Sequence, residues 1–164
     1  VVARGRALGA TWQADEIDRL VLPRSALIDR MAGLLGGRAA EELVFGEPGS
    51  GAADDLRRVG EIARRMVCEL GMGEGLSPLD YPDGAAFHGR SEELDRAIEA
   101  EVGRLVDEAH AKALAVLTAS REALESGAQA LLERETLSAA ELDAIAGPPL
   151  PLPVALAVVR EAGR

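Results

Sequence analysis

Four long stretches of this sequence repeat apolar residues at intervals of three and four, the spacing that places side chains on one face of an α-helix. Leucine, valine, isoleucine and alanine fill these repeats, and aromatic residues make up only 2% of the chain. We therefore expect a mainly α fold, in which helices pack as an antiparallel bundle around an aliphatic core. The predicted helices run from Arg24 to Val44, from Ala52 to Leu70, from Ser91 to about Leu117 and from Arg121 to Arg134.

The same spacing predicts which side chains face the core. In the first helix these are Leu27, Met31, Leu34 and Leu35, and in the second Leu56, Val59, Ala63, Met66, Val67 and Leu70. In the third they are Leu94, Ile98, Val102, Leu105, Val106, Ala109 and Ala113. The single cysteine, Cys68, lies in the apolar pattern of the second helix and is predicted to be a core residue, because it has no second cysteine to pair with.

Shorter signals complete the outline of the fold. The segment from Arg6 to Gln13 contains Thr11 and Trp12 and predicts a short exposed strand. Ser50 is a plausible cap for the second helix. Near the end, Ser138 and Glu141 have the spacing of a capping box, which predicts a last short helix to Ile145.

The charge balance excludes one class of partner. The formal net charge is −10, from 28 acidic and 18 basic residues, and the basic residues form no block. Such a surface does not attract a phosphate backbone, so we expect no nucleic-acid partner. The sequence also contains no run of about 20 apolar residues and no signal-peptide pattern at its start, so we expect this piece to be soluble.

A pair of glycines, Gly36 and Gly37, lies inside the first predicted helix. Each glycine there costs about 1 kcal/mol relative to alanine. The pair predicts that another backbone, or a loop of a metal site, passes close to the helix; the alternative is a break in the helix at this point.

The stretch from Leu34 to Asp55 combines this glycine pair with a doubled glutamate, a Gly-rich turn and a doubled aspartate. Ordinary core packing does not require such an arrangement. Taken alone, Asp54 and Asp55 are read as acidic residues at a helix N-terminus, where the helix dipole favours negative charge.

Several longer motifs of this chain resemble the peptidase domain of the FtsH family, the ATP-dependent zinc metalloproteases. The resemblance extends from about Val2 to Ala146 and includes the turn Phe87 to Arg90 and the string ETLSAAEL near the end. The motifs that carry it are RGRALGATWQ from Arg4 to Gln13, LLGGRAAEELVFGE from Leu34 to Glu47, GAADDL from Gly51 to Leu56, and ARRMVCELGM from Ala63 to Met72.

The resemblance implies a domain layout. Residues 1–146 would be the C-terminal part of an FtsH-type peptidase domain, with metal-site helices over 24–70 and a helical bundle over 91–146. The fold class is then a mainly α helical bundle of that type with one short N-terminal β segment. Residues 147–164, which contain the string GPPLPLP, are expected to be a Pro-rich tail that is poorly ordered or docked on a partner.

The resemblance also implies a zinc site. In the family two histidines of an H-E-x-x-H helix and a later aspartate hold the zinc, the glutamate of that helix is the general base, and the fourth position is left for water. The position that matches the aspartate is Asp55. Glu41 lies where the family has a glutamate near the metal, so it is expected to orient a ligand; the alternative is a solvated glutamate pair formed with Glu42.

Other expectations concern substrates and assembly. Residues Ala7, Leu8, Gly9, Ala10 and Thr11 match the family's edge strand, to which an unfolded substrate can add as a further strand, although they are equally read as scaffold. The resemblance further implies unfolded or membrane protein substrates and a homo-hexamer. ATP and Mg would belong to an ATPase domain that this sequence lacks, and a membrane anchor outside it would place the parent protein on the cytoplasmic side of the inner membrane.

The chain departs from the family in one important respect, because it contains no H-E-x-x-H motif. Its two histidines, His88 and His110, are predicted in a loop and on a distant helix, and His110 is expected at a helix surface or half-buried. The simplest interpretation is a fragment that starts downstream of the histidine helix and is inactive alone. The alternative is a metal-free descendant of the domain that serves as a helical interaction or oligomerisation module.

Overall fold

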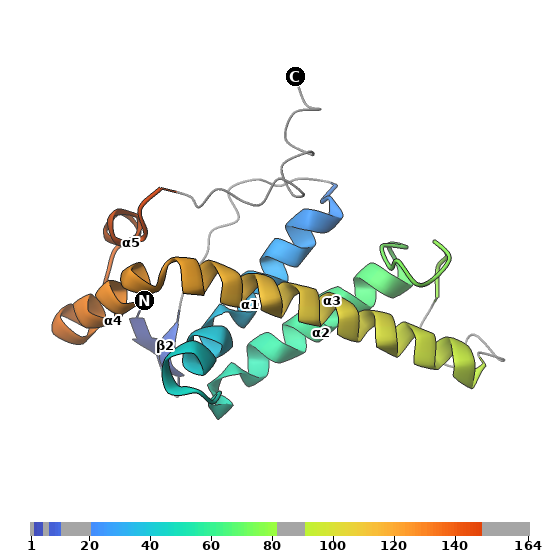
Figure 1. The fold of residues 1–164 in the computed structure, drawn as a ribbon, viewed down its shortest axis with the longest axis horizontal. Coiled ribbons are helices and arrows are strands. Elements are labelled where there is room, and N and C mark those ends of the chain that lie inside the picture. Colours follow the sequence, from blue (N-terminus) through green and yellow to red (C-terminus); the bar gives the residue numbers. More distant parts are fainter. Residues whose placement is uncertain (1, 5–6, 11–20, 82–90, 149–164) are drawn as a thin grey trace, which may run out of the picture. The chain divides into compact units, whose positions relative to one another are not determined.

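The computed structural model describes residues 2–4, 7–10, 21–81 and 91–148. Its elements in chain order are strands β1 (Val2–Arg4) and β2 (Ala7–Ala10), helix α1 (Arg24–Phe45), a 3-10 turn η1 (Ser50–Ala52), and helices α2 (Ala53–Cys68), α3 (Glu92–Ala119), α4 (Arg121–Arg134) and α5 (Ala139–Ala146) (Figure 1). The mainly α fold is confirmed, and the helix bounds lie within a few residues of those that the apolar spacing predicts.

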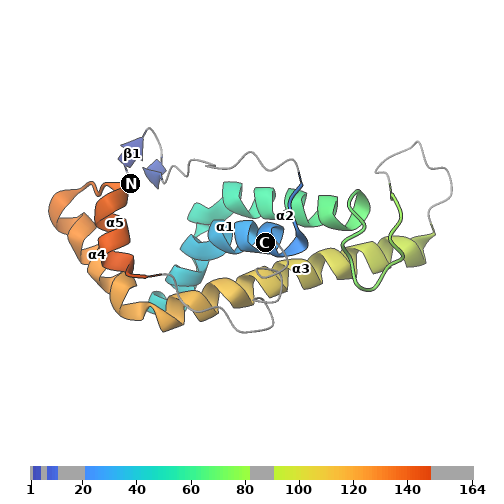
Figure 2. The same cartoon turned by 90° about the horizontal axis from the view of Figure 1, so that it is seen from above.

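Helices α1, α2 and most of α3 form one compact unit, and β1, β2, α4 and α5 belong to a second. In the first unit α1 and α2 pack directly against each other, and α3 adds its apolar face to the same core (Figure 2). The largest fully buried side chains come from all three helices: Met31, Val59, Met66, Val67, Ile98 and Leu105. Cys68 is buried as predicted. Burial of these side chains is the main stabilising term for the unit.

Charged side chains join α1 to α3 beside this core. Arg24 donates two hydrogen bonds to Glu108, of 2.9 Å from Nη1 and 2.5 Å from Nη2. Lys112 pairs with Asp29, and His110 Nε2 lies 2.9 Å from Glu42 Oε2. Glu108, His110 and Lys112 of α3 thus contact α1 near its start, near its end and in its second turn, respectively.

Two predicted core residues of α2 are exposed in the structure. Leu56 is 40% exposed and Leu70 is 43% exposed, whereas the predicted core residues between them are buried. Leu56 lies in the first turn of α2, and Leu70 follows the end of that helix. Helical spacing fixes the face of a side chain, but neighbouring helices must reach that face to bury it.

The glycine pair lies inside an unbroken helix, because α1 continues through Gly36 and Gly37 to Phe45. The alternative of a helix break at this point is therefore wrong. A Cβ atom added at either glycine would meet nothing within 4 Å, so no backbone in the described part of the chain passes close to the pair. Open space at two glycines means that alanine would fit at both positions.

The second unit contains the predicted capping box. Ser138 Oγ accepts a hydrogen bond from the Glu141 backbone N–H at 3.4 Å, and the Ser138 N–H donates to Glu141 Oε2 at 2.8 Å. These bonds begin α5, which packs against α4.

The N-terminal strands also belong to the second unit. Strands β1 and β2 pair antiparallel, with Val2 opposite Ala10 and Arg4 opposite Ala7. The predicted β segment covers β2, while Thr11 and the Pro-rich tail from residue 149 lie outside the described residues. Within the described ranges, none of the helices combines the length and the apolar character that a bilayer crossing requires.

Candidate metal centre

The two aspartates at the start of α2 have different environments. Asp54 is exposed, and its Oδ1 accepts a hydrogen bond of 2.9 Å from Arg57 Nη2. Asp55 is half-buried and, within the described part of the chain, has no hydrogen bond or ion pair. A carboxylate held in the first turn of a helix is favoured by the helix dipole and has its oxygens available. Of the pair, Asp55 is the one that could bind a further group.

A short turn between α1 and α2 determines where Asp55 lies. Helix α1 ends at Phe45 and is capped by Gly46, whose φ of 80° is left-handed and whose N–H donates to the Glu42 carbonyl oxygen at 3.0 Å. The chain then passes through η1 and enters α2 at Ala53. Neither η1 nor α2 begins with a side-chain cap, so the predicted capping by Ser50 is wrong. A side chain of α1 instead forms a hydrogen bond to the turn that precedes α2.

That restraint comes from Glu41 on α1. Its Oε2 accepts a hydrogen bond of 2.5 Å from the Gly49 backbone N–H. A Cβ atom on Gly49 would lie 3.2 Å from Glu41 Oε2 and 3.4 Å from Oε1, which is tighter than ordinary contact. A glycine at this position therefore allows the carboxylate to approach the turn.

The neighbouring Glu42 has different partners. It pairs with Arg38 on its own helix at 3.1 Å and with His110 of α3 at 2.9 Å. His110 Nε2 makes no well-aligned hydrogen bond in the described structure, so its approach to Glu42 is close but poorly directed. Both glutamates are half-buried, and each has a partner of its own. His110 is half-buried, as predicted.

The described residues do not form a complete zinc site. They contain no group of three or more histidine, cysteine, aspartate or glutamate residues that could hold a metal ion. A catalytic zinc takes three protein ligands and keeps one open position. Asp55 fits the carboxylate ligand of such a site, because its oxygens have no other partner, but the remaining ligands are not among the described residues. His88 lies outside them.

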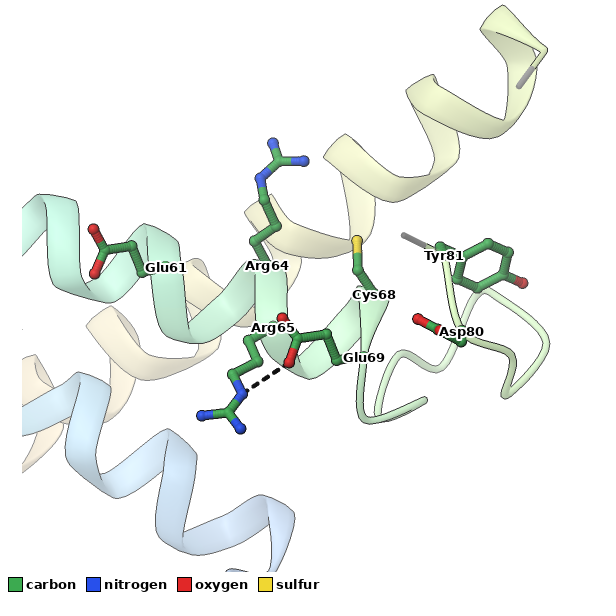
Figure 3. A pocket seen from close by; sticks show the side chains of 7 residues that line it. All are labelled: Glu61, Arg64, Arg65, Cys68, Glu69, Asp80 and Tyr81. Atoms are coloured by element: carbon green, nitrogen blue, oxygen red, sulfur yellow. Dashed lines mark hydrogen bonds and ion pairs between the residues drawn. The ribbon is translucent and has the colours of Figure 1, made fainter. Parts of the chain in front are cut away.

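A pocket of about 510 Å³ lies beside the C-terminal half of α2 (Figure 3). Asp55 lies in the first turn of that helix. Its two arginines are both engaged: Arg65 Nε donates to Glu69 Oε2 at 3.0 Å, and Arg64 pairs with Glu99. The α2 residues that line the pocket run from Glu61 to Cys68, six to 13 residues after Asp55, which corresponds to roughly 9 to 20 Å along a helix, and Asp55 is not among them. The pocket is therefore separate from the Asp55 region. Its lining is Glu61, Arg64, Arg65, Cys68, Glu69, Asp80 and Tyr81.

A buried carboxylate that the apolar pattern does not predict holds the loop after α2. Glu101 of α3 is buried and accepts hydrogen bonds from Arg104 and from the Glu74 backbone N–H. The hydrogen bond from Arg104 is the first cause that lowers the pKa of Glu101. The sequence feature that could have predicted this buried pair is a glutamate on the inward face of α3, three residues before an arginine.

Comparisons with known proteins cover almost the whole chain. Peptidase family M41 matches residues 1–145. The chain is 44% identical to "ATP-dependent zinc metalloprotease FtsH 4" of Sorangium cellulosum over 158 residues, which are 90% of this chain and 24% of that protein. It is 40% identical over 153 residues to the ATP-dependent zinc metalloproteases FtsH of Thermotoga maritima and Bacillus subtilis, covering 87% of this chain and 25% and 24% of theirs. The chain spans about a quarter of the length of these curated relatives.

Proposed function

Because this chain belongs to peptidase family M41, we propose that it supplies part of the peptidase domain of an ATP-dependent zinc metalloendopeptidase. The main observation in support is the environment of Asp55, a half-buried carboxylate in the first turn of α2 without a partner in the described part of the chain. A binding group that already had an ion pair would have to lose that pair before it could hold a cation. Among the described residues Asp55 has no such pair to lose, in contrast to Asp54 beside it.

The chemistry of the proposal assigns Asp55 one ligand position. When bound, zinc would act as a Lewis acid and activate a water molecule for attack on the peptide carbonyl. Asp55 would hold the metal from the start of a helix, a rigid element that fixes the direction of the carboxylate. The two histidines and the general base would come from an H-E-x-x-H helix elsewhere in the full-length protein.

Strand β2 supplies the proposed substrate contact. Its partner in the described structure is β1, and an extended peptide that added to the sheet would be held by backbone hydrogen bonds whatever its sequence. Such binding suits a protease that accepts unfolded chains. The proposed edge consists of Ala7 to Ala10 within β2, together with Thr11.

The remaining features of the proposal concern the full-length protein. It would couple this domain to an ATPase that uses ATP and Mg, assemble as a homo-hexamer, and degrade unfolded or membrane proteins at the cytoplasmic side of the inner membrane. The support is the match to relatives named ATP-dependent zinc metalloproteases.

The test uses the full-length protein and compares Asp55→Ala with Asp54→Ala. The expected result is that the wild type binds zinc and cleaves casein, that Asp55→Ala loses both, and that Asp54→Ala keeps both. Asp54 is the matched control because it is adjacent, equally acidic and already paired with Arg57. If the full-length protein binds no zinc, or if Asp55→Ala alters neither zinc content nor cleavage, the protease assignment fails and a metal-free interaction module takes its place.

A further inference from the structure

One side chain of α1, that of Glu41, forms a hydrogen bond to the turn between α1 and α2. In residues 46–52, all of which the structure describes, the hydrogen bond from the Gly49 N–H to Glu41 is the only bond to a side chain. Gly46 adds a backbone hydrogen bond at the end of α1, and η1 also packs against α1 and α2. Without a side-chain cap on η1 or α2, the Glu41 carboxylate is the group that ties the turn back to α1.

The strength of this restraint follows from its geometry. The donor to acceptor distance is 2.5 Å, and the acceptor is a half-buried carboxylate. Hydrogen bonds to ionised acceptors are shorter and about twice as strong as neutral ones. Gly49 has no side chain that would keep the carboxylate away, since a Cβ atom there would lie 3.2 Å from Glu41 Oε2.

Only a short rigid path separates this bond from Asp55. Residues Ser50 to Ala52 form η1, and α2 begins at once with Ala53, so Asp55 lies in the third position of the helix. A displacement of Gly49 is therefore passed on to the Asp55 carboxylate through hydrogen-bonded backbone. A shift of about 1 Å is enough to disturb a site built for a metal ion.

We infer that Glu41 is a positioning residue, which holds the turn at Gly49 and through it sets the place of Asp55. This role differs from direct orientation of a metal ligand, because Glu41 acts on the backbone before any metal binds. The expected effect on zinc binding rests on the proposed function of Asp55 as a zinc ligand. The hydrogen bond between Glu41 and Gly49 does not depend on that proposal, because both residues belong to this chain.

The first measurement is amide hydrogen exchange of this chain without metal. Glu41→Ala is expected to raise the exchange rate of the Gly49 amide by about 10-fold, because a charge-assisted hydrogen bond is lost. Glu41→Gln keeps an oxygen acceptor and is expected to restore most of the protection. Glu42→Ala is the matched control, since Glu42 contacts Arg38 and His110 instead, and it should leave Gly49 unchanged. Unchanged exchange at Gly49 in Glu41→Ala would overturn the inference.

The second measurement is the zinc dissociation constant of the full-length protein. Glu41→Ala is expected to weaken zinc binding by about 10-fold to 100-fold, as loss of an outer support of a ligand does, with recovery in Glu41→Gln. A pair of glycine variants checks the path: Gly49→Ala should weaken zinc binding, whereas at Gly51 a Cβ atom would meet nothing within 4 Å and alanine should have little effect.

The outcomes separate this inference from the proposed function. If Glu41→Ala frees the Gly49 amide but leaves zinc affinity unchanged while Asp55→Ala abolishes it, the positioning role is refuted and the zinc site stands. If Asp55→Ala leaves zinc binding intact, the proposed function fails, and with it the consequence of Glu41 for the metal. The exchange rate at Gly49 reports on the restraint in either case.

Discussion

Replacement of the buried Glu101 by alanine tests the account of how the loop after α2 is held. The Glu101 side chain is 6% exposed and lies between α3 and the loop. Its carboxylate accepts hydrogen bonds of 2.6 Å from Arg104 Nη2 and of 2.7 Å from the Glu74 backbone N–H. Arg104 Nε also lies 3.0 Å from both carboxylate oxygens, and alanine removes all of these bonds at once.

The expected loss of stability follows from what remains after the substitution. The Glu74 N–H loses its acceptor, which costs about 1–3 kcal/mol where water cannot replace it. Arg104 keeps Glu108 at 3.3 Å and is 37% exposed, so solvent screening limits the loss of its pair to about 1 kcal/mol. We expect Glu101→Ala to lower the free energy of unfolding by about 3 kcal/mol and Tm by roughly 10 °C.

The assay is thermal and urea unfolding of this chain followed by circular dichroism. Glu99→Ala is the matched control on the same helix, because Glu99 is exposed and its surface pair with Arg64 should contribute about 0.5 kcal/mol or less. Glu101→Gln keeps an acceptor for the Glu74 N–H and should fall between the wild type and Glu101→Ala. A Glu101→Ala protein as stable as Glu99→Ala would refute the reasoning.

The pH dependence of this effect has a defined sign. The pKa of Glu101 is lowered from 4.5 in the folded protein, first by the hydrogen bond from Arg104. The unfolded state therefore takes up a proton at higher pH than the folded state. The stabilisation by the Glu101 charge is complete above about pH 4.5 and is lost as the pH falls through the folded pKa. The stability difference between the wild type and Glu101→Gln should shrink over that acidic range.

Two further predictions concern glycines and the capping box. Gly37→Ala should raise the free energy of unfolding by about 1 kcal/mol, because a Cβ atom there meets nothing within 4 Å in the described structure. Gly73→Ala should lower the free energy of unfolding, because its Cβ atom would lie 2.9 Å from Glu101 Cγ. Urea unfolding measures both changes, and a destabilised Gly37→Ala protein would contradict the open space at that helix face. Ser138→Ala should speed amide exchange at the start of α5, and a protected Glu141 amide in that variant would contradict the capping role. Hydrogen bonds from Ser138, together with Arg134, lower the pKa of Glu141 to about 2. The contribution of the Glu141 carboxylate should therefore be complete above pH 4.5 and be lost as the pH falls through about 2, which exchange measured against pH would show.

Local patterns in the sequence were sufficient to predict the helices. The apolar spacing gave the α4 range, Arg121 to Arg134, as the structure has it, and the bounds of the other long helices to within a few residues. The spacing of Ser138 and Glu141 predicted the capping box and α5. These features depend on residues three or four positions apart, which meet as soon as the helix forms.

Only part of the candidate site could be predicted from the sequence. Asp55 was assigned from its motif, and the structure adds that it is half-buried and without a partner in the described residues. The different partners of the doubled glutamates were not predictable from the sequence. Glu41 contacts Gly49 across a turn, and Glu42 contacts His110, which is 68 positions away on another helix. For such contacts the sequence pattern supplies the groups but not the distances between them.

The sequence by itself determined the helices, their apolar faces and the family to which the chain belongs, since these are written in local spacing and in motif letters. Only the tertiary structure decided that Leu56 and Leu70 remain exposed, that Glu101 is buried, and that α1 passes unbroken through its glycines. The physical reason is that burial and ion pairing depend on which helix lies opposite a given face. That arrangement is set by packing over the whole core, so no single stretch of sequence contains it.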